Sequence, residues 1–294
     1  MNTDFFLEEA KFYIGNCYAQ FNAYQKITWG ILEYVNQLFS DNKITYYLAY
    51  GTLLGAIRDK GQIPWDYDVD IHVKVSDREK LLHVLKTKMS DDYYYVYTDT
   101  MPNYPAECLR ICKKGYTYMA FHVDVFFLCG CADDKVKRIP HLKMARKWAN
   151  FRVQKYAYKH DGSLHNIIGV RLRIIWLLKQ LYRLVPEKCI LNREQKILFL
   201  YDINECKYLM SYCFTANWGD NEYEVYPSEI FSSVSYININ GVNYPIPTGY
   251  DKYLTLLFGN YMNYLPIESR FSEFYNQLKQ ISYRQKFYEE IILK

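Results

Sequence analysis

The sequence predicts an α+β fold, because strands and helices alternate along the segment from residue 44 to residue 130. The apolar run ITYYLAYG at 44–51 has the length of a buried strand, and the segment 52–61 is predicted to be a short helix that ends at a glycine. A second strand, DVDIHV at 68–73, follows a turn that contains a proline. This alternation is compatible with an α/β core as well as with an α+β core.

Amphipathic helices and a hairpin are predicted around these two strands. Apolar residues recur at helical spacing over 18–41 and over 78–89, as in helices that pack on a sheet. The segments 107–115 and 119–128 are expected to form a hairpin. The predicted core therefore extends from about residue 25 to about residue 130.

A mainly helical elaboration with one hairpin is predicted for the rest of the chain, about 131–294. A basic helix is expected over 137–160, and the Asn-Gly pair at 240–241 is typical of a tight hairpin turn. No internal repeat, low-complexity tract or linker interrupts the sequence. Residues 1–294 are therefore expected to form a single domain.

Composition indicates a protein of the cytoplasm that does not bind nucleic acid. The net charge is +4, whereas nucleic-acid binders usually show a stronger and clustered basic excess. The start of the chain, MNTDFFLEEAKF, is acidic and lacks the apolar region of a signal peptide. No apolar run reaches the roughly 18 residues of a membrane-spanning helix.

One segment, residues 170–185, has the pattern of a helix that lies on a membrane surface. It interleaves arginine and lysine with a dense set of aliphatic and aromatic residues. The alternative is a helix packed on the core with its arginines in solvent. The first interpretation makes the protein peripheral at the inner face of the membrane.

The eight cysteines are expected to be mostly reduced thiols, because no secretion signal is present. Cys108 and Cys112, followed by Cys129 and Cys131, could suggest a zinc site. Their spacing is not a common zinc signature, and both pairs lie in or beside predicted strands. Buried structural cysteines are the first interpretation and a zinc site is the second.

Three carboxylates mark the candidate reaction centre. Asp68 and Asp70 are two residues apart on a predicted strand, so they project from one face and suit Mg²⁺, with Mn²⁺ as the alternative. Asp124 is a lone carboxylate in the apolar segment FHVDVFFL, which makes its burial costly unless it is paired or bound to metal. If the two strands are neighbours, the three carboxylates could hold one or two cations for in-line attack at phosphorus. Asp124, or more weakly His122, could instead act as a general base.

A candidate phosphate-binding turn precedes the first of these carboxylates. Gly51 and Thr52 lie where a strand turns into a helix, and the N–H groups of a helix N-terminus bind phosphate. Arg58 could then hold a phosphate through two hydrogen bonds. A strand, a Gly-Thr turn, a helix and a strand with Asp-x-Asp follow one another in the order typical of the nucleotidyltransferase (polymerase-β-like) superfamily.

The segment YGTLLGAIRDKGQIPWDYDVDI at 50–71 closely resembles the hallmark segment of the LicD family. This family includes bacterial phosphocholine transferases and the fukutin-related ribitol-phosphate transferases. HVDVFFL at 122–128 and PIPTGYDKYLTLLFGNYMNYLP at 245–266 support the resemblance, which covers about 25–270. It implies a nucleotidyltransferase-like mixed sheet flanked by helices, and transfer of a phosphoalcohol from a CDP-activated donor to a glycan hydroxyl with release of CMP.

The resemblance also implies roles for particular residues. The metal-binding and catalytic carboxylates by position are Asp68, Asp70 and Asp124. The residues assigned to the donor and its support are Gly51, Thr52, Arg58 and Asp66. His72 departs from the family pattern, where a small residue is usual, and this puts the identity of the donor alcohol in doubt.

The expected donor group is phosphocholine, with ribitol phosphate and glycerol phosphate as alternatives. The expected acceptor is a cell-surface glycan, such as capsule, teichoic acid or lipopolysaccharide, or its lipid-linked precursor. Two other functions stay open at this point: a nucleotidyltransferase that moves NMP from an NTP to a protein, small molecule or RNA, and a non-catalytic glycan-binding protein.

Overall fold

The computed structural model describes residues 17–102, 104, 108–156, 184–212 and 224–287. The chain forms two compact units. The first comprises Met1–Tyr95, Arg110–Val125 and Glu229–Lys294, and the second comprises Val96–Leu109 and Phe126–Ser228. The prediction that the whole chain is a single LicD-like domain stays a prediction.

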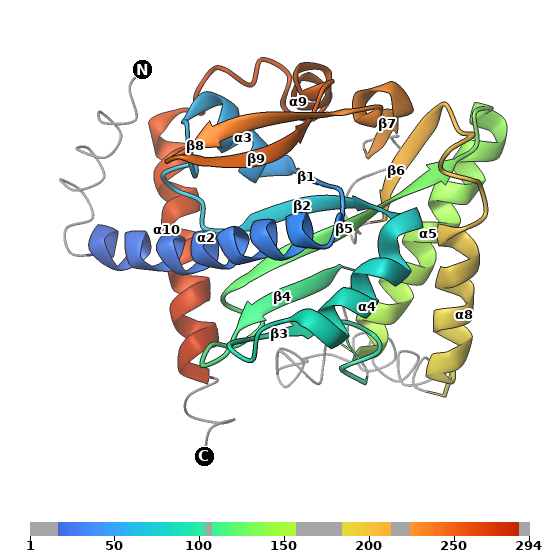
Figure 1. Ribbon diagram of the computed structural model, residues 1–294, viewed down its shortest axis with the longest axis horizontal. Helices are drawn as coiled ribbons and strands as arrows, with labels where there is room; N and C mark the ends of the chain where they lie inside the picture. Colours follow the sequence, from blue (N-terminus) through green and yellow to red (C-terminus); the bar gives the residue numbers. More distant parts are fainter. Residues whose placement is uncertain (1–16, 103, 105–107, 157–183, 213–223, 288–294) are drawn as a thin grey trace, which may run out of the picture. The chain divides into compact units, whose positions relative to one another are not determined.

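The predicted alternation of helices and strands is confirmed in the first unit (Figure 1). In chain order its elements are α2 (Cys17–Asp41), β1 (Tyr46–Leu48), α3 (Tyr50–Arg58), β2 (Val69–Lys74), the short helix η1 (Val75–Asp77), α4 (Arg78–Lys88), β3 (Tyr93–Val96), β4 (Leu109–Lys113) and β5 (His122–Cys131). The strands pair in the order β1-β2-β5-β4-β3, and β1 runs antiparallel to β2. The fold is therefore of the mixed α+β kind that the sequence predicts.

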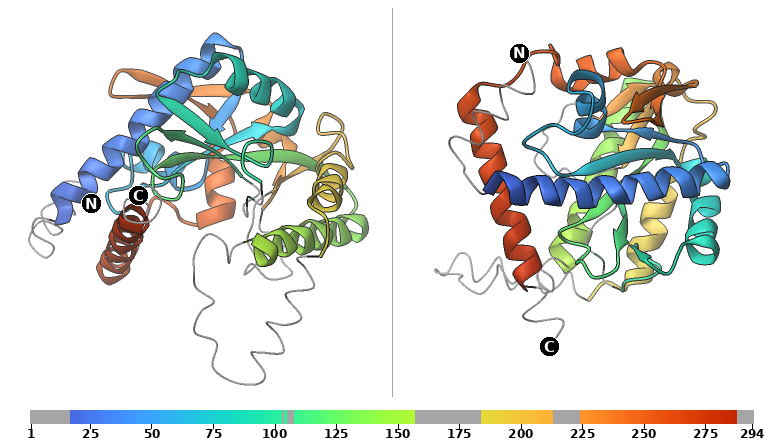
Figure 2. Two further views of the ribbon diagram at one scale, coloured as in Figure 1. Left: turned by 90° about the horizontal axis from the view of Figure 1, so that it is seen from below. Right: turned by 60° about the vertical axis from the view of Figure 1, so that its left-hand side comes forward.

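Two long helices of the first unit meet on this sheet. Helix α2 buries one apolar face, as its periodicity predicts, and it lies across the sheet in Figure 1. Figure 2 shows α10 (Ile267–Phe287) crossing α2 near the start of α2. The ring of Phe21 on α2 packs on that of Phe274 on α10, with 4.6 Å between the ring centroids. This contact brings the C-terminal helix to the strands that carry the aspartates.

The predicted Asn-Gly hairpin is confirmed. Strands β8 (Val234–Ile239) and β9 (Val242–Pro247) pair antiparallel, with Tyr236 opposite Pro245. Asn240 and Gly241 form the turn with φ values of 51° and 87°, which is the left-handed backbone that a two-residue hairpin turn requires. Helix η2 (Ser228–Phe231) precedes the hairpin and α9 (Tyr250–Phe258) follows it.

Besides Val96–Leu109, the second unit contains the end of β5, α5 (Lys135–Tyr156), α8 (Glu187–Leu198), β6 (Tyr208–Tyr212) and β7 (Val225–Pro227). Here β5 pairs antiparallel with β6, and β6 with β7. A fully buried Arg152 on α5 forms an ion pair with Glu194 on α8. Because an unpaired buried charge is strongly destabilising, this pair fixes how the two helices pack.

Two element boundaries and one additional strand differ from the sequence-based expectation. Strand β1 has only three residues, and α3 begins at Tyr50, so Gly51 and Thr52 lie in the first turn of a helix. Strand β3 was not predicted, because its run of tyrosines shows no alternation of apolar and polar side chains. The chain therefore turns into α3 earlier than the length of the apolar run suggests.

Two predictions concern membranes and cysteines. Within the described residues, no helix has both the length and the apolar character needed to cross a bilayer. The predicted surface helix at 170–185 lies outside the described residues, except for Leu184 and Val185. Cys108, Cys112, Cys129 and Cys131 are buried and are not joined in disulfides, as the structural interpretation of these cysteines predicts.

Candidate active site

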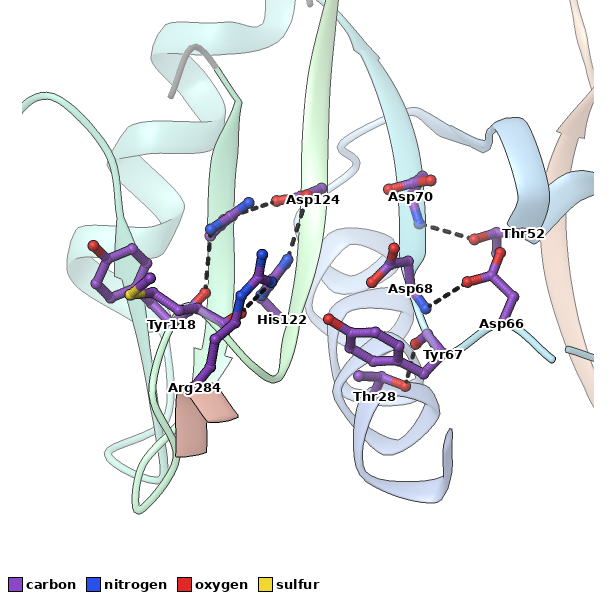
Figure 3. A network of polar contacts seen from close by, with 12 residues as sticks. Thr28, Thr52, Asp66, Tyr67, Asp68, Asp70, Tyr118, His122, Asp124 and Arg284 are labelled. Carbon is purple, nitrogen blue, oxygen red and sulfur yellow. Dashed lines mark hydrogen bonds and ion pairs between the residues drawn. The ribbon is translucent and has the colours of Figure 1, made fainter. Parts of the chain in front are cut away.

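Strand β2 and the residue before it hold the two central carboxylates. Asp68 and Asp70 point to the same side, as alternation along a strand requires (Figure 3). Among the described residues, neither side-chain carboxylate accepts a hydrogen bond or forms a close ion pair. Burial and the neighbouring carboxylate of Asp124 raise the pKa of both groups. The site thus places two poorly compensated negative charges side by side.

Asp124 lies on β5, next to β2 in the sheet, so the predicted adjacency of the two strands is confirmed. Its carboxylate faces Arg110 and His122 (Figure 3). Arg110 Nε donates a hydrogen bond to Asp124 Oδ1 at 2.9 Å, and His122 Nε2 lies 3.3 Å from Oδ2. Burial alone would raise the pKa of Asp124, but the Arg110 guanidinium and His122 outweigh it. They hold that pKa well below its usual range. Asp124 is therefore ionised at neutral pH.

Arg110 and Arg284 supply positive charge that the sequence-based prediction missed. Arg110 comes from β4 and Arg284 from α10, where Arg284 Nη1 donates to the carbonyl of Met119 at 2.9 Å. Both cations lower the pKa of Asp68 and so oppose the effect of its burial. Arg110 interrupts an apolar strand, and this signal could have revealed it. Nothing in the sequence near Arg284 connects it to the aspartates.

Asp66 precedes Asp68 and Asp70 in the chain, and its carboxylate accepts hydrogen bonds from a backbone donor and a side-chain donor. Its Oδ1 accepts hydrogen bonds from Asp68 N at 3.2 Å and from Gln277 Nε2 at 3.4 Å. A Cβ atom at position 51 would lie only 2.8 Å from Asp66 Oδ2, so Gly51 allows the close approach of this carboxylate. Burial, together with the charge of Asp68, raises the pKa of Asp66 to about 8. Gly51 thus has a structural role beside the predicted one at the donor phosphates.

Replacing Asp66 by Asn is expected to stabilise the protein in a pH-dependent way. Because the folded-state pKa is raised from 3.8 to about 8, ionisation of Asp66 destabilises the folded state progressively as pH rises through this window. Asp66→Asn keeps the Oδ1 acceptor and removes the charge. Thermal unfolding should show a Tm gain of a few degrees at pH 8 and almost none at pH 4. A gain of the same size at both pH values would contradict the assigned cause.

Thr52 and Tyr50 fix the start of α3 against β2. Thr52 Oγ1 accepts a hydrogen bond from Asp70 N at 2.8 Å, which ties the helix to the strand that carries the carboxylates. Tyr50 has a φ of 44°, a left-handed conformation that costs a non-glycine residue about 1–2 kcal/mol. Its N–H donates to Tyr253 Oη at 3.3 Å. The role of Thr52 toward a donor phosphate stays a prediction.

In this structure Arg58 contacts Asp59 and Tyr264 and not the carboxylates of the candidate reaction centre. Its guanidinium forms an ion pair with Asp59 at 3.0 Å, and its side chain is only 5% exposed. It also lies over the ring of Tyr264, 4.5 Å from the centroid. The predicted contact between Arg58 and a pyrophosphate stays a prediction. For this contact, the guanidinium would have to reach the donor although it is already paired with Asp59.

His72 continues the face of Asp68 and Asp70 but is completely buried. Its Nε2 lies 2.9 Å from Tyr253 Oη, and the rings of Tyr50 and Phe231 pack around it. His72 therefore packs against α9 through Tyr253 and against η2 through Phe231.

Asp68 and Asp70 offer carboxylate oxygens, which are the type of ligand that a hard divalent cation prefers. A cation would offset the repulsion that raises the pKa of Asp68 and Asp70, and oxygen ligands are those that Mg²⁺ prefers. The described parts of the chain contain no group of three or more His, Cys, Asp or Glu side chains that could hold a metal ion. Mg²⁺ often uses only one or two protein carboxylates together with water and substrate phosphates. Asp68 and Asp70 are the pair that fits this mode.

Comparison with known proteins connects this geometry to a family. Residues 43–129, which contain all three carboxylates and Arg110, match the family model described as LicD/FKTN/FKRP, nucleotidyltransferase domain. Residues 43–129 are a LicD-family domain. The predicted family, and with it the prediction of a LicD-type transferase, is confirmed.

Relatives extend the LicD similarity over most of the chain. The chain is 26% identical over 271 residues to the lipopolysaccharide cholinephosphotransferase LicD of Haemophilus influenzae, an alignment that covers 84% of this chain and 92% of that protein. An uncharacterized protein of Rickettsia prowazekii is 38% identical over 84 residues, or 29% of each chain. The similarity to the Haemophilus protein therefore includes the parts beyond the LicD domain.

Proposed function

We propose that the protein transfers phosphocholine from a CDP-activated donor to a hydroxyl of a cell-surface glycan or its lipid-linked precursor, with release of CMP. The observation that carries this proposal is the pair Asp68 and Asp70, without hydrogen-bond donors, beside an Asp124 held ionised by Arg110. The name of the Haemophilus influenzae relative supports choline phosphate as the group and lipopolysaccharide as the acceptor. A nucleotidyltransferase-like fold and a reaction at the cytoplasmic side of the membrane belong to the same proposal.

Asp68 and Asp70 would hold Mg²⁺, with Asp124 adjacent to them. When bound, the ion supplies charge neutralisation on the donor phosphates and on the departing CMP oxygen. The acceptor oxygen attacks the phosphorus that carries choline, the bond from this phosphorus to the CMP oxygen breaks, a phosphodiester forms, and the hydroxyl proton is released to water. Asp124, ionised at neutral pH, accepts a hydrogen bond from the attacking hydroxyl and orients it.

The neighbouring cations have a separate role in this scheme. Arg110 and His122 hold Asp124 in one orientation and keep it ionised. Arg110 and Arg284 also reduce the repulsion between Asp68 and an incoming diphosphate, because both guanidiniums act on Asp68. The chain thus provides fixed charges of both signs around the reacting phosphorus.

A donor comparison tests the proposal. The purified protein is incubated with Mg²⁺, delipidated lipopolysaccharide and one of CDP-choline, CDP-ribitol, CDP-glycerol or the four NTPs, and CMP and pyrophosphate are measured. We expect CMP release to be fastest with CDP-choline, to require the acceptor and to stop when EDTA removes the metal.

The same assay separates the other candidate functions. Pyrophosphate from NTPs, with no CMP from any CDP-alcohol, would support the nucleotidyltransferase alternative and contradict the proposal. Saccharide binding without any release of CMP or pyrophosphate would support a non-catalytic glycan-binding protein. Faster release from CDP-ribitol or CDP-glycerol would keep the reaction and change the alcohol.

A further inference from the structure

A groove lies in the first unit, away from the aspartates. It has a volume of about 390 Å³, within the range of about 300–1,000 Å³ that small-molecule sites occupy. Three elements form it: the end of α2, the turn into β1 with the first residue of that strand, and one face of the β8–β9 hairpin. The lining residues are Asn36, Gln37, Ser40, Lys43, Ile44, Thr45, Tyr46, Val234, Tyr236, Asn243 and Pro245.

The groove lies on the face of β1 and β2 opposite to the reaction centre. Tyr46 pairs with Val73 in the β1–β2 ladder, and Leu48 pairs with Ile71. Side chains alternate along a strand, so Tyr46 projects to the face opposite to that of Asp70. A ligand in the groove therefore occupies a site separate from Asp68, Asp70 and Asp124.

The walls of the groove are mainly neutral and polar, with an exposed aromatic ring. Amide and hydroxyl side chains supply both donors and acceptors, and Lys43 is the one charged lining residue. The ring of Tyr236 is 66% exposed, on the same face of the hairpin as Pro245 and Asn243. A tyrosine ring presents an apolar surface and a hydroxyl to the same ligand. This combination suits a saccharide, whose C–H faces stack on aromatic rings while its hydroxyls pair with amides.

Part of the groove is held in place by its own hydrogen bonds. Tyr46 Oη donates to Asn36 Oδ1 at 2.7 Å, and Asn36 Nδ2 donates to the carbonyl of Asn243 at 3.3 Å. These bonds join β1, α2 and β9 and fix the orientation of the Asn36 amide. A fixed polar group loses less conformational freedom when a ligand binds.

Lys43 adds a backbone observation. Its φ of 53° is left-handed, at the end of a helix where glycine is the usual residue. A side chain is disfavoured in this conformation. Lys43 is also one of the residues that line the groove. Strained residues of this kind cluster at ligand sites.

We propose that this groove is a second saccharide-binding site, in which a sugar ring stacks on Tyr236 and hydrogen-bonds to Asn36, Asn243 and Lys43. That the bound saccharide is a distal part of the acceptor glycan rests on the proposed function. Tyr46 is three residues before Ala49, whose N–H pairs with the carbonyl of Asp70. Three residues of a strand span about 10 Å, so the groove and the strand that carries Asp70 lie within the length of a short oligosaccharide.

Saccharide binding without any donor tests the groove. Delipidated lipopolysaccharide from Haemophilus influenzae is titrated into the full chain in EDTA, and the affinity is measured by calorimetry. We expect Tyr236→Ala to weaken binding about tenfold or more, because the stacking surface is lost. Tyr236→Phe should retain most of the affinity. The matched control is Tyr275→Ala, since Tyr275 is 56% exposed on α10 and does not line the groove.

The possible outcomes test the saccharide-binding role of the groove and the proposed function separately. Equal affinity for wild type and Tyr236→Ala, or no binding by wild type, would overturn the groove as a saccharide site. A Tyr236-dependent affinity together with no CMP release from any CDP-alcohol would keep the groove and overturn the proposed function. If both hold, Tyr236→Ala should raise KM for the acceptor and leave kcat unchanged.

Discussion

Asp70→Asn is expected to reduce phosphocholine transfer by about 10³-fold or more and to raise the free energy of unfolding. The carboxylate has no hydrogen-bond donor among the described residues, and burial with the charges of Asp124 and Asp68 raises its pKa well above the usual value. At neutral pH its ionisation therefore opposes folding when no cation is bound. The amide is nearly isosteric and neutral, so it removes this repulsion together with the ligand for the metal.

Two measurements on one set of variants check this result. CMP release in Mg²⁺ gives the loss of activity, and thermal unfolding in EDTA at pH 7 gives the change in stability, which we expect to be about 1–3 kcal/mol in favour of the variant. The control is Asp91→Asn, since Asp91 is exposed and should change neither. Substantial transfer by Asp70→Asn would remove Asp70 from the proposed machinery. A lower Tm in EDTA would show that the carboxylate has a partner in the folded state.

Sequence patterns were sufficient for the carboxylates because each one violates a local expectation. Asp68 and Asp70 alternate on a strand, and Asp124 interrupts an apolar strand. Charges in such places need compensation nearby, which links strands that are distant in the sequence. The adjacency of β2 and β5 confirms the prediction that the strand of Asp124 is a neighbour of the strand of Asp70.

The compensating charges could not be derived in the same way. Arg110 reaches Asp124 because β4 lies beside β5, and Arg284 comes from a helix about 160 residues further along the chain. Both positions follow from tertiary packing, such as that of Phe21 on Phe274, and local periodicity carries no information on it. The pairing of Arg58 with Asp59 was missed for a related reason. A sequence shows that an arginine is present but not which neighbour occupies it.

Arg110→Met is expected to reduce kcat by about 10–100-fold and to shift the acid limb of its pH profile upward. In the wild type, the guanidinium of Arg110 and His122 outweigh burial and depress the pKa of Asp124. Without the guanidinium, His122 alone opposes the effect of burial, so the pKa of Asp124 rises. A fraction of the enzyme then carries a protonated Asp124 that no longer accepts a hydrogen bond from the acceptor hydroxyl. The pH dependence of kcat measures this shift directly.

The free energy of unfolding tests the ion pair between Arg110 and Asp124 independently of activity. A depressed folded-state pKa contributes stability above the unfolded value of about 4, and this contribution is lost as pH falls through the folded pKa. Arg110→Met should therefore be about 1–3 kcal/mol less stable than wild type at pH 7, with a smaller difference at pH 3. Arg110→Lys retains the charge, so it should keep the acid limb near the wild-type position even if its geometry lowers kcat. A pH profile of Arg110→Met that superimposes on that of the wild type would mean that Arg110 only packs the strand, because a purely structural role cannot move the titration of Asp124.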